Sequence, residues 1–405
     1  MSGLWSQFGA ALEQRATTTA IASTGVGTLT FSSAHGLRAN DIIILTGATP
    51  SGWNGTYVVQ TVPSSTTLTI LTPSNPTNAT VQPTVTGYGV AGVTVSRFWE
   101  YNNEGVKINA GRIKSSGLRA GARQVRSDRS IPYVVDAVGP IEMDVMSKGF
   151  GFWLQQMLGS LAIATNTPVA TVQTMTATIG SLVGVSFCGQ VGLPYTGAPG
   201  SGLATTVVPK NLYGAKVVGW ELMCEKDGAL KLKLDIDAQN GDYLGSIAVA
   251  SYPTAEPLTF LGGAVTIGGT AVDATKVSVK GTNGVRTDGR KIRSSPLKKE
   301  PFVNAFTEIT VAVDLDFASL TNQNRIFAAT AAGTETTFGV TFTGTSFIVG
   351  STYPSLALSI PAVQWNGDSP VIGGPDIVPE TLVGEVLDTG ASLVTATYIT
   401  LDTVA

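Results

Sequence analysis

The stretch GPIEMDVMSKGFGFWLQQMLGS, residues 139–160, decides the fold class of this chain. Its first half alternates apolar with acidic side chains, which is typical of a half-buried strand. Its second half follows Lys148-Gly149 and spaces its apolar side chains as one stripe of a short helix ending at Gly159. The helix residues expected to pack are Phe150, Trp153, Leu154, Met157 and Leu158. Nearly all of the remaining chain shows strand and turn patterns, so we predict a mainly β protein with one packed helix.

The composition supports a β-rich structural protein. The 405 residues are 43% hydrophobic and only 13% charged, and 47 of them are Gly. Many short strands joined by tight turns fit this mix, and a low charge indicates that much of the surface faces protein partners. The net charge of −3 gives no basic field for nucleic acid. We expect no signal peptide and no membrane span, because no basic segment precedes an apolar run and no run reaches about 18 apolar residues.

No residue pattern predicts catalysis or a cofactor. The single histidine, His35, lies in an Ala-His-Gly-Leu sequence, where closing a turn is favoured over a catalytic role. Two separated cysteines, Cys188 and Cys224, argue against both a disulfide framework and a metal site with soft ligands. Nucleotide-binding and nucleophile-elbow motifs do not occur in the sequence. We therefore predict that the protein is not an enzyme and binds no cofactor.

Three carboxylate pairs are spaced by two residues, so each pair shares one face of a strand. They are Glu142/Asp144, Asp235/Asp237 and Asp314/Asp316. Such pairs bind Ca²⁺ or act as paired acids in other proteins. Because no Asp/Asn/Gly calcium loop accompanies them here, an outward-facing strand surface is the favoured interpretation.

The chain divides into three parts by pattern. Residues 1–16 are expected to form a short helix or an extended segment that acts as an N-terminal arm. Residues 17–95 are expected to form a small all-β domain with two strand-turn-strand units. Residues 96–405 form the main domain, in which Leu230–Ala238 alternates strictly, with its leucines inward and its charged residues outward. The last pattern, Glu385–Val404, predicts a final edge strand.

Basic residues concentrate in two segments that we predict to be loops, residues 107–129 and 286–299. Phosphate binding is one interpretation. The segments lack interleaved aromatic residues and the chain is acidic overall, so contacts with neighbouring subunits are favoured. The candidate contact residues are Lys107, Arg112, Lys114, Arg119, Arg123, Arg126, Arg129, Arg286, Arg290, Lys291 and Arg293.

Taken in serial order, these segments resemble the major tail tube proteins of long-tailed, non-contractile bacteriophages of the siphovirus type. The resemblance covers residues 1–16 and about 96–405, whereas residues 17–95 resemble a small β-module inserted into such a protein. The segments that carry it are SRFWEY (96–101), IKSSGLRAGARQVRSDRS (113–130), residues 139–160, GLPYTG (192–197), LYGAKVVGWELMCEKDGALKLKLDIDA (212–238), YPTAEPLTF (252–260) and EITVAVDLDF (308–317).

The resemblance implies a tail-tube β-sandwich or barrel with one short α-helix on its outer face and the 17–95 module projecting outside. Subunits would form stacked hexameric rings around one continuous barrel without open edges, which conducts viral double-stranded DNA during genome ejection without sequence-specific binding. Implied partners are further copies of the chain, the tape measure protein, the tail terminator and distal tail proteins. The implied location is the virion tail, after synthesis in the host bacterial cytoplasm. The lumen candidates are Glu142, Asp144, Asp235 and Asp237.

Two other functional classes stay open. The first is a different β-rich virion component, such as a capsid decoration or baseplate protein. The second is a carbohydrate-binding or hydrolytic β-protein, which would need exposed aromatic residues beside paired carboxylates. Trp53 and Trp365 are the aromatic candidates for that role, although neither has a carboxylate pair close in sequence.

Overall fold

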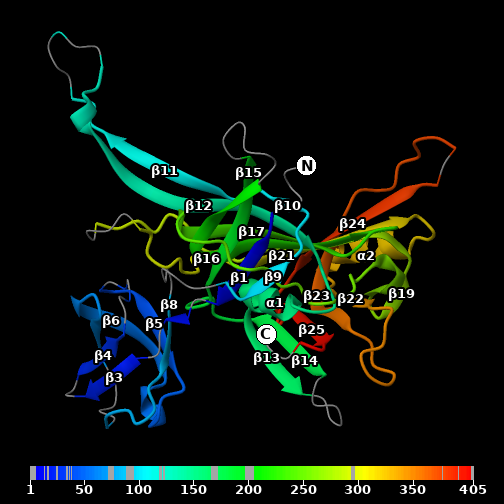
Figure 1. Ribbon diagram of the computed structural model, residues 1–405. Coiled ribbons are helices and arrows are strands. Elements are labelled where there is room, and N and C mark those ends of the chain that lie inside the picture. Colours follow the sequence, from blue (N-terminus) through cyan, green and yellow to red (C-terminus); the bar gives the residue numbers. More distant parts are fainter. Residues whose placement is uncertain are drawn as a thin grey trace.

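The computed structural model of the protein consists mainly of antiparallel β-strands arranged as a small sheet beside a large curved one (Figure 1). It describes residues 6–12, 14–15, 18–23, 26–32, 35, 37, 39–71, 77–87, 95–117, 121, 124–165, 172–196, 205–292, 297–375, 377–390 and 392–402. None of the described helices is long and apolar enough to span a membrane.

The small sheet has seven strands in the order β2-β8-β5-β6-β7-β4-β3 and a core of its own. In that core Trp53 is fully buried and donates from Nε1 to the Thr77 carbonyl at 2.9 Å. His35 closes a turn as predicted, because its Nδ1 accepts from the Leu37 N–H at 3.1 Å. That this unit is an insertion projecting from a tube stays a prediction. Its elements are β2 Gln14–Arg15, β3 Thr18–Ser23, β4 Val26–Phe31, β5 Ile42–Thr46, the 3-10 turn Ser51–Trp53, β6 Gly55–Ser64, β7 Thr67–Leu71 and β8 Thr84–Gly87.

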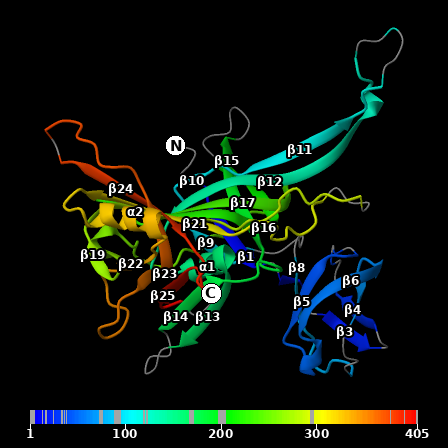
Figure 2. The ribbon, with the colours of Figure 1, turned by 180° about the vertical axis from the view of Figure 1, so that it is seen from behind.

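The remaining strands join in one large sheet that curls into a barrel (Figure 2). One wall pairs in the order β12-β17-β16-β20-β21-β24. Strand β23 turns the corner, because its last residues pair with β24 and its first residues pair with β25, from which β14 and β13 continue. The wall strands are β12 Ser130–Asp144, β17 Lys231–Asp242, β16 Thr205–Glu225, β20 Ala274–Thr282, β21 Glu308–Asp316 and β24 Pro379–Val386; the others named here are β23 Ser355–Asn366, β25 Thr395–Thr400, β14 Gln173–Ile179 and β13 Gly159–Thr165.

Shorter strands complete the large sheet at its margins. On one side β22 and β18 extend the sheet from β23, and on another β15, β1 and β9 extend it from the first part of β16. Their bounds are β1 Phe8–Leu12, β9 Arg97–Trp99, β10 Asn103–Glu104, β11 Lys107–Lys114, β15 Phe187–Thr196, β18 Gly263–Ile267, β19 Thr270–Val272 and β22 Thr336–Thr343, with 3-10 turns at Ser127–Arg129 and Phe260–Gly262.

The predicted helix forms as α1, Phe150–Leu158, between Gly149 and Gly159, which both adopt left-handed backbone conformations. Eight of its nine residues are buried, including all five that were expected to pack. The expectation of a single apolar stripe is therefore wrong, whereas the placement of the helix on the outer face of a tube stays a prediction. The opposite side is covered as well, because Phe152 contacts the rings of Trp99 on β9 and Phe187 on β15.

Four other local predictions need correction. The segment at Phe8–Leu12 is a strand of the large sheet rather than a helix. Residues 107–114, predicted as loop, form strand β11. The last strand, β25, is internal because it pairs with β14 and β23 on either side. A second helix, α2 Thr321–Ala332, packs on β23.

Candidate assembly surfaces

The wall formed by β12, β17, β16, β20 and β21 has one apolar face and one polar face. In β17, Leu232 and Leu234 are fully buried, whereas Lys233 and Asp235 between and beside them are exposed, as the alternation predicted. The antiparallel registers place outward residues of neighbouring strands opposite one another. We call the resulting surface the polar sheet face; it consists of Glu142, Asp144, Glu221, Glu225, Lys231, Lys233, Asp235, Lys276, Lys280 and Asp314.

The polar sheet face carries both signs of charge in alternation. Glu142 lies opposite Lys233 in the register, and its Oε1 is 3.5 Å from Lys231 Nζ. Asp144 lies opposite Lys231 and accepts from Asn102 Nδ2 at 2.7 Å. These pairings leave little field of either sign above the strands, so the surface is mixed rather than acidic.

The prediction that Asp237 faces outward with Asp235 is wrong, because its side chain is only 2% exposed. Residues 285–292 and 297–303, here called the strap, lie over the end of the wall. Lys298 in the strap contacts Asp237 Oδ1 at 2.5 Å and Asp136 Oδ2 at 3.3 Å. Burial raises the pKa of Asp237 in spite of the hydrogen bond from Lys298.

Further contacts within the chain hold the strap in place. Glu300 forms a buried ion pair with Lys216 at 2.7 Å. Arg290 donates to Asp136 Oδ2 at 2.9 Å, so this predicted inter-subunit residue is engaged within its own chain. Burial would raise the pKa of Asp136, but hydrogen bonds from Arg290 and from an asparagine of β11 outweigh it and lower that pKa.

The other predicted residues of this basic segment are more open. Arg286 is exposed and bound to Asp288 in its own loop, and Lys291 is exposed. Arg293 lies outside the described residues.

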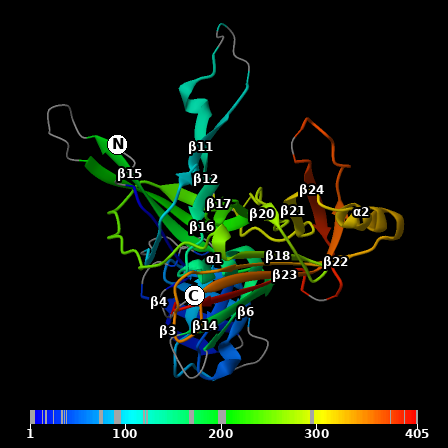
Figure 3. The same ribbon diagram turned by 90° about the vertical axis from the view of Figure 1, so that its right-hand side faces the viewer.

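The most prominent surface feature is a two-stranded hairpin, called here the arm, in which β11 pairs with residues 130–138 of β12. It extends far from the body of the protein, as Figures 1 and 3 show. Its base is fixed, because Lys210 Nζ contacts Glu104 Oε1 at 2.5 Å and the Val106 carbonyl at 2.8 Å. An isolated hairpin is marginally stable in water, and its free edges are templates for pairing with another chain.

The side chains of the arm also favour a partner. Ile113 lies opposite Ile131, and the two are 55% and 62% exposed. Tyr133 and Val138 are exposed on the same strand of the arm. The exposed basic residues of the arm and its described tip are Lys107, Arg112, Lys114, Arg126 and Arg129, whereas Arg119 and Arg123 lie outside the described residues.

Three further segments expose large apolar side chains on loops. Val371 and Ile372 lie on the connection from β23 to β24, Leu244 and Val249 lie after β17, and Phe306 lies just beyond the strap. Scattered apolar side chains are normal on a surface, so of these segments only the adjacent pair Val371 and Ile372 indicates a contact site.

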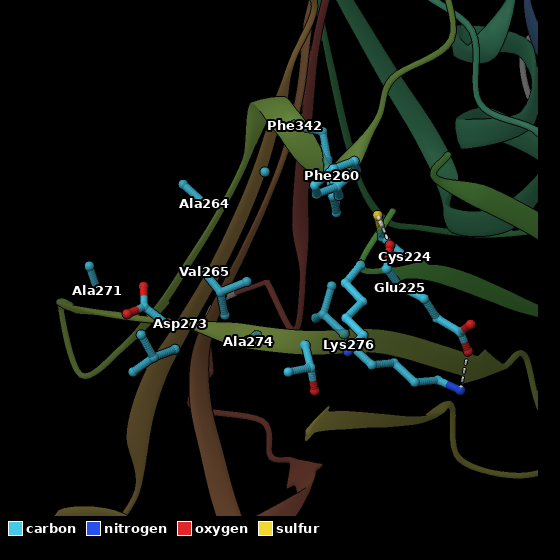
Figure 4. Close-up of a pocket in the computed structure, with 15 residues that line it drawn as sticks. Cys224, Glu225, Phe260, Ala264, Val265, Ala271, Asp273, Ala274, Lys276 and Phe342 are labelled. Atoms are coloured by element: carbon cyan, nitrogen blue, oxygen red, sulfur yellow. Dashed lines mark hydrogen bonds and ion pairs between the residues drawn. The ribbon is translucent and has the colours of Figure 1, made fainter. Parts of the chain in front are cut away.

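A groove of about 360 Å³ beside β16, β18 and β20 offers no catalytic chemistry (Figure 4). Lys276 at its margin is bound to Glu225 at 2.7 Å. Burial raises the pKa of the Cys224 thiol, which stays protonated and a weak nucleophile. Among the described residues no group of three His, Cys, Asp or Glu side chains is placed to hold a metal ion.

The aromatic residues considered for sugar binding are not available on the surface. Trp53 and Trp365 are both fully buried. Trp365 donates from Nε1 to Thr336 Oγ1 at 2.6 Å within the large sheet. Both therefore pack cores, and the observation that motivated a carbohydrate-binding role disappears.

The chain matches a model of a known protein family over most of its length. The sequence model of a family described as phage tail tube protein matches residues 56–386, a range that begins in β6 of the small sheet and ends with β24. A search among curated proteins gives no match.

Proposed function

The chain belongs to the phage tail tube proteins, structural components of the virion tail, and we propose that its copies assemble into stacked hexameric rings forming a non-contractile tail of the siphovirus type. In this proposal the tube conducts viral double-stranded DNA during genome ejection. The arm is the observation that carries the proposal, because a projecting hairpin with exposed apolar side chains and a free strand edge is suited to contact with another protein surface.

The polar sheet face is the proposed lumen wall, with Glu142, Asp144 and Asp235 as lining residues. Its alternating charges support this role, because a conduit must not hold phosphate groups tightly. A strongly basic wall would bind the DNA backbone and slow its passage. Asp237 is withdrawn from this set because it is buried beneath the strap.

Contacts between rings are proposed for the arm, with the loop at Val371 and Ile372 as a second contact. The terminal rings would contact the tail terminator at one end and distal tail proteins at the other, and the lumen would hold the tape measure protein before DNA passes. The small β-domain is proposed to project outside the tube, so none of its residues is proposed to line the lumen. Synthesis would take place in the cytoplasm of the host bacterium.

Negative-stain electron microscopy of the purified chain, alone and with a tail initiator complex, tests this function. We expect rings with sixfold symmetry and tubes of stacked rings. Trimeric or pentameric particles would instead select a capsid decoration or baseplate protein. A chain that stays monomeric at every concentration and with the initiator would contradict the tube.

A further inference from the structure

A lysine and two carboxyl groups meet in a buried cluster beneath the strap. Lys298 Nζ lies 2.5 Å from Asp237 Oδ1 and 3.3 Å from Asp136 Oδ2. The side chains of Lys298 and Asp237 are 4% and 2% exposed, and that of Asp136 is 12% exposed. The three residues come from the strap, β17 and β12, so folding of the large sheet brings them together.

The two carboxyl groups differ in their environments. Asp136 accepts from Arg290 Nη2 at 2.9 Å and from Asn109 Nδ2 at 3.0 Å, which favours its ionised form. Asp237 accepts from Lys298 through Oδ1, while its Oδ2 is buried without a hydrogen-bond partner among the described residues. Burial disfavours the charged form of the Asp237 carboxyl group and raises its pKa.

We propose that Lys298 Nζ and Asp237 Cγ condense into an intramolecular amide bond, a covalent cross-link between the strap and β17. In the proposed step the Lys298 ammonium first passes a proton to Asp237 through their 2.5 Å contact. The amine then attacks Asp237 Cγ, and the N–C bond forms as the bond from Cγ to the hydroxyl oxygen breaks. Asp136 accepts one proton from Nζ and passes it to the departing hydroxyl, which leaves as water. The sum is one ammonium and one carboxylate converted to an amide and water, with no oxidation or reduction.

Two features favour condensation at this site over a simple ion pair. Asp136 lies within reach of Nζ as a proton carrier, held by Arg290 and Asn109 rather than by Asp237. The strap also keeps bulk water from the acid and the amine, because both side chains are almost completely buried. The cross-link is formed within one chain and does not depend on assembly of a tube.

Intact-mass spectrometry of the full-length chain in a denaturing solvent tests the proposal. We expect a mass lower than that of the sequence by one water molecule, and a proteolytic digest with a branched peptide joining residues 237 and 298. A full sequence mass in the folded, purified protein would overturn the proposal. A water loss located at Asp227-Gly228 or Asp288-Gly289 would also overturn it, because Asp-Gly sequences lose water by forming a succinimide.

Variants provide the controls for this measurement. Lys298→Arg keeps the positive charge but removes the amine, and Asp237→Ala removes the acid, so both should show the full sequence mass. Lys291→Arg, an exposed position in the same strap, should retain the water loss. Persistence of the loss in Lys298→Arg would overturn the assignment, and the mass of the wild-type chain decides the question if a variant fails to fold.

Discussion

Replacing the apolar pair at the exposed part of the arm should weaken assembly without unfolding the subunit. The double variant Ile113→Thr/Ile131→Thr exchanges an ethyl group for a hydroxyl at each position and keeps β-branched side chains in both strands. Complete burial of the two carbon atoms of each ethyl group would contribute about 1.6 kcal/mol per residue to association, at about 0.8 kcal/mol for each carbon. Only the exposed 55% and 62% remain to be buried by a partner, which reduces the loss to about 1 kcal/mol per residue.

The sum for one arm is about 2 kcal/mol, which corresponds to roughly a 30-fold weaker association at about 1.4 kcal/mol for each factor of ten. The assay is the critical concentration for tube formation, measured by sedimentation and electron microscopy. Thermal unfolding followed by circular dichroism should show that the free energy of unfolding changes by no more than about 0.5 kcal/mol, as for other surface substitutions. Leu71→Thr, at a position 58% exposed on the small sheet, is the matched control and should assemble normally. An unchanged critical concentration for the folded double variant would refute the role of the arm.

Three further substitutions test the packing of the subunit. Trp153→Ala empties the centre of α1, where the indole is fully buried, and should lower the free energy of unfolding by about 3–5 kcal/mol in denaturant titrations; a loss below about 1 kcal/mol would contradict the buried position. Arg290→Glu places a carboxylate beside Asp136 and should lower the free energy of unfolding by about 3 kcal/mol. This is the lower end of the range for breaking a buried ion pair, because the Arg290 side chain is 28% exposed. A fully stable variant with a defect in assembly alone would restore the predicted inter-subunit role of Arg290. Asp402 accepts from the Gly149 N–H at the start of α1, and burial raises the pKa of its carboxyl group above the ordinary value of 3.8. The folded state therefore holds the carboxyl proton of Asp402 more tightly than the unfolded chain does. The resulting stability is present at low pH and is lost as the pH rises through the folded pKa. Asp402→Asn should therefore lose less stability than the wild type over that rise, and identical pH profiles of the two melting temperatures would disprove the coupling.

Local periodicity predicted the parts of the fold in which one side of an element is apolar. The alternating segment Leu230–Ala238 forms most of strand β17, Lys231–Asp242, and its leucines are buried as predicted. The helix at Phe150 was found because bulky apolar residues repeat between two glycines. In each case the apolar residues that form the sequence pattern are the residues whose burial stabilises the element.

Elements stabilised by partners outside the local sequence were missed. Strand β11 shows no inward face, because most of its side chains are exposed, so alternation gave no signal there. Helix α2 buries only Gln323 and Ile326, which leaves no apolar stripe to detect. The prediction for Asp237 was wrong for a related reason. Alternation predicts on which side of a strand a residue lies, but not whether a distant residue such as Lys298 covers that side.

The central claim is that this chain builds a tube through contacts between its own copies. Cryo-electron microscopy of the assembled particles tests it most directly, since one reconstruction gives the ring symmetry, the lumen wall and the position of the arm. We predict stacked sixfold rings with Glu142 and Asp235 facing the lumen and the arm of each subunit covered by a neighbouring copy. Particles in which the arm is free in solvent, or in which the polar sheet face lies on the outside, would contradict the account.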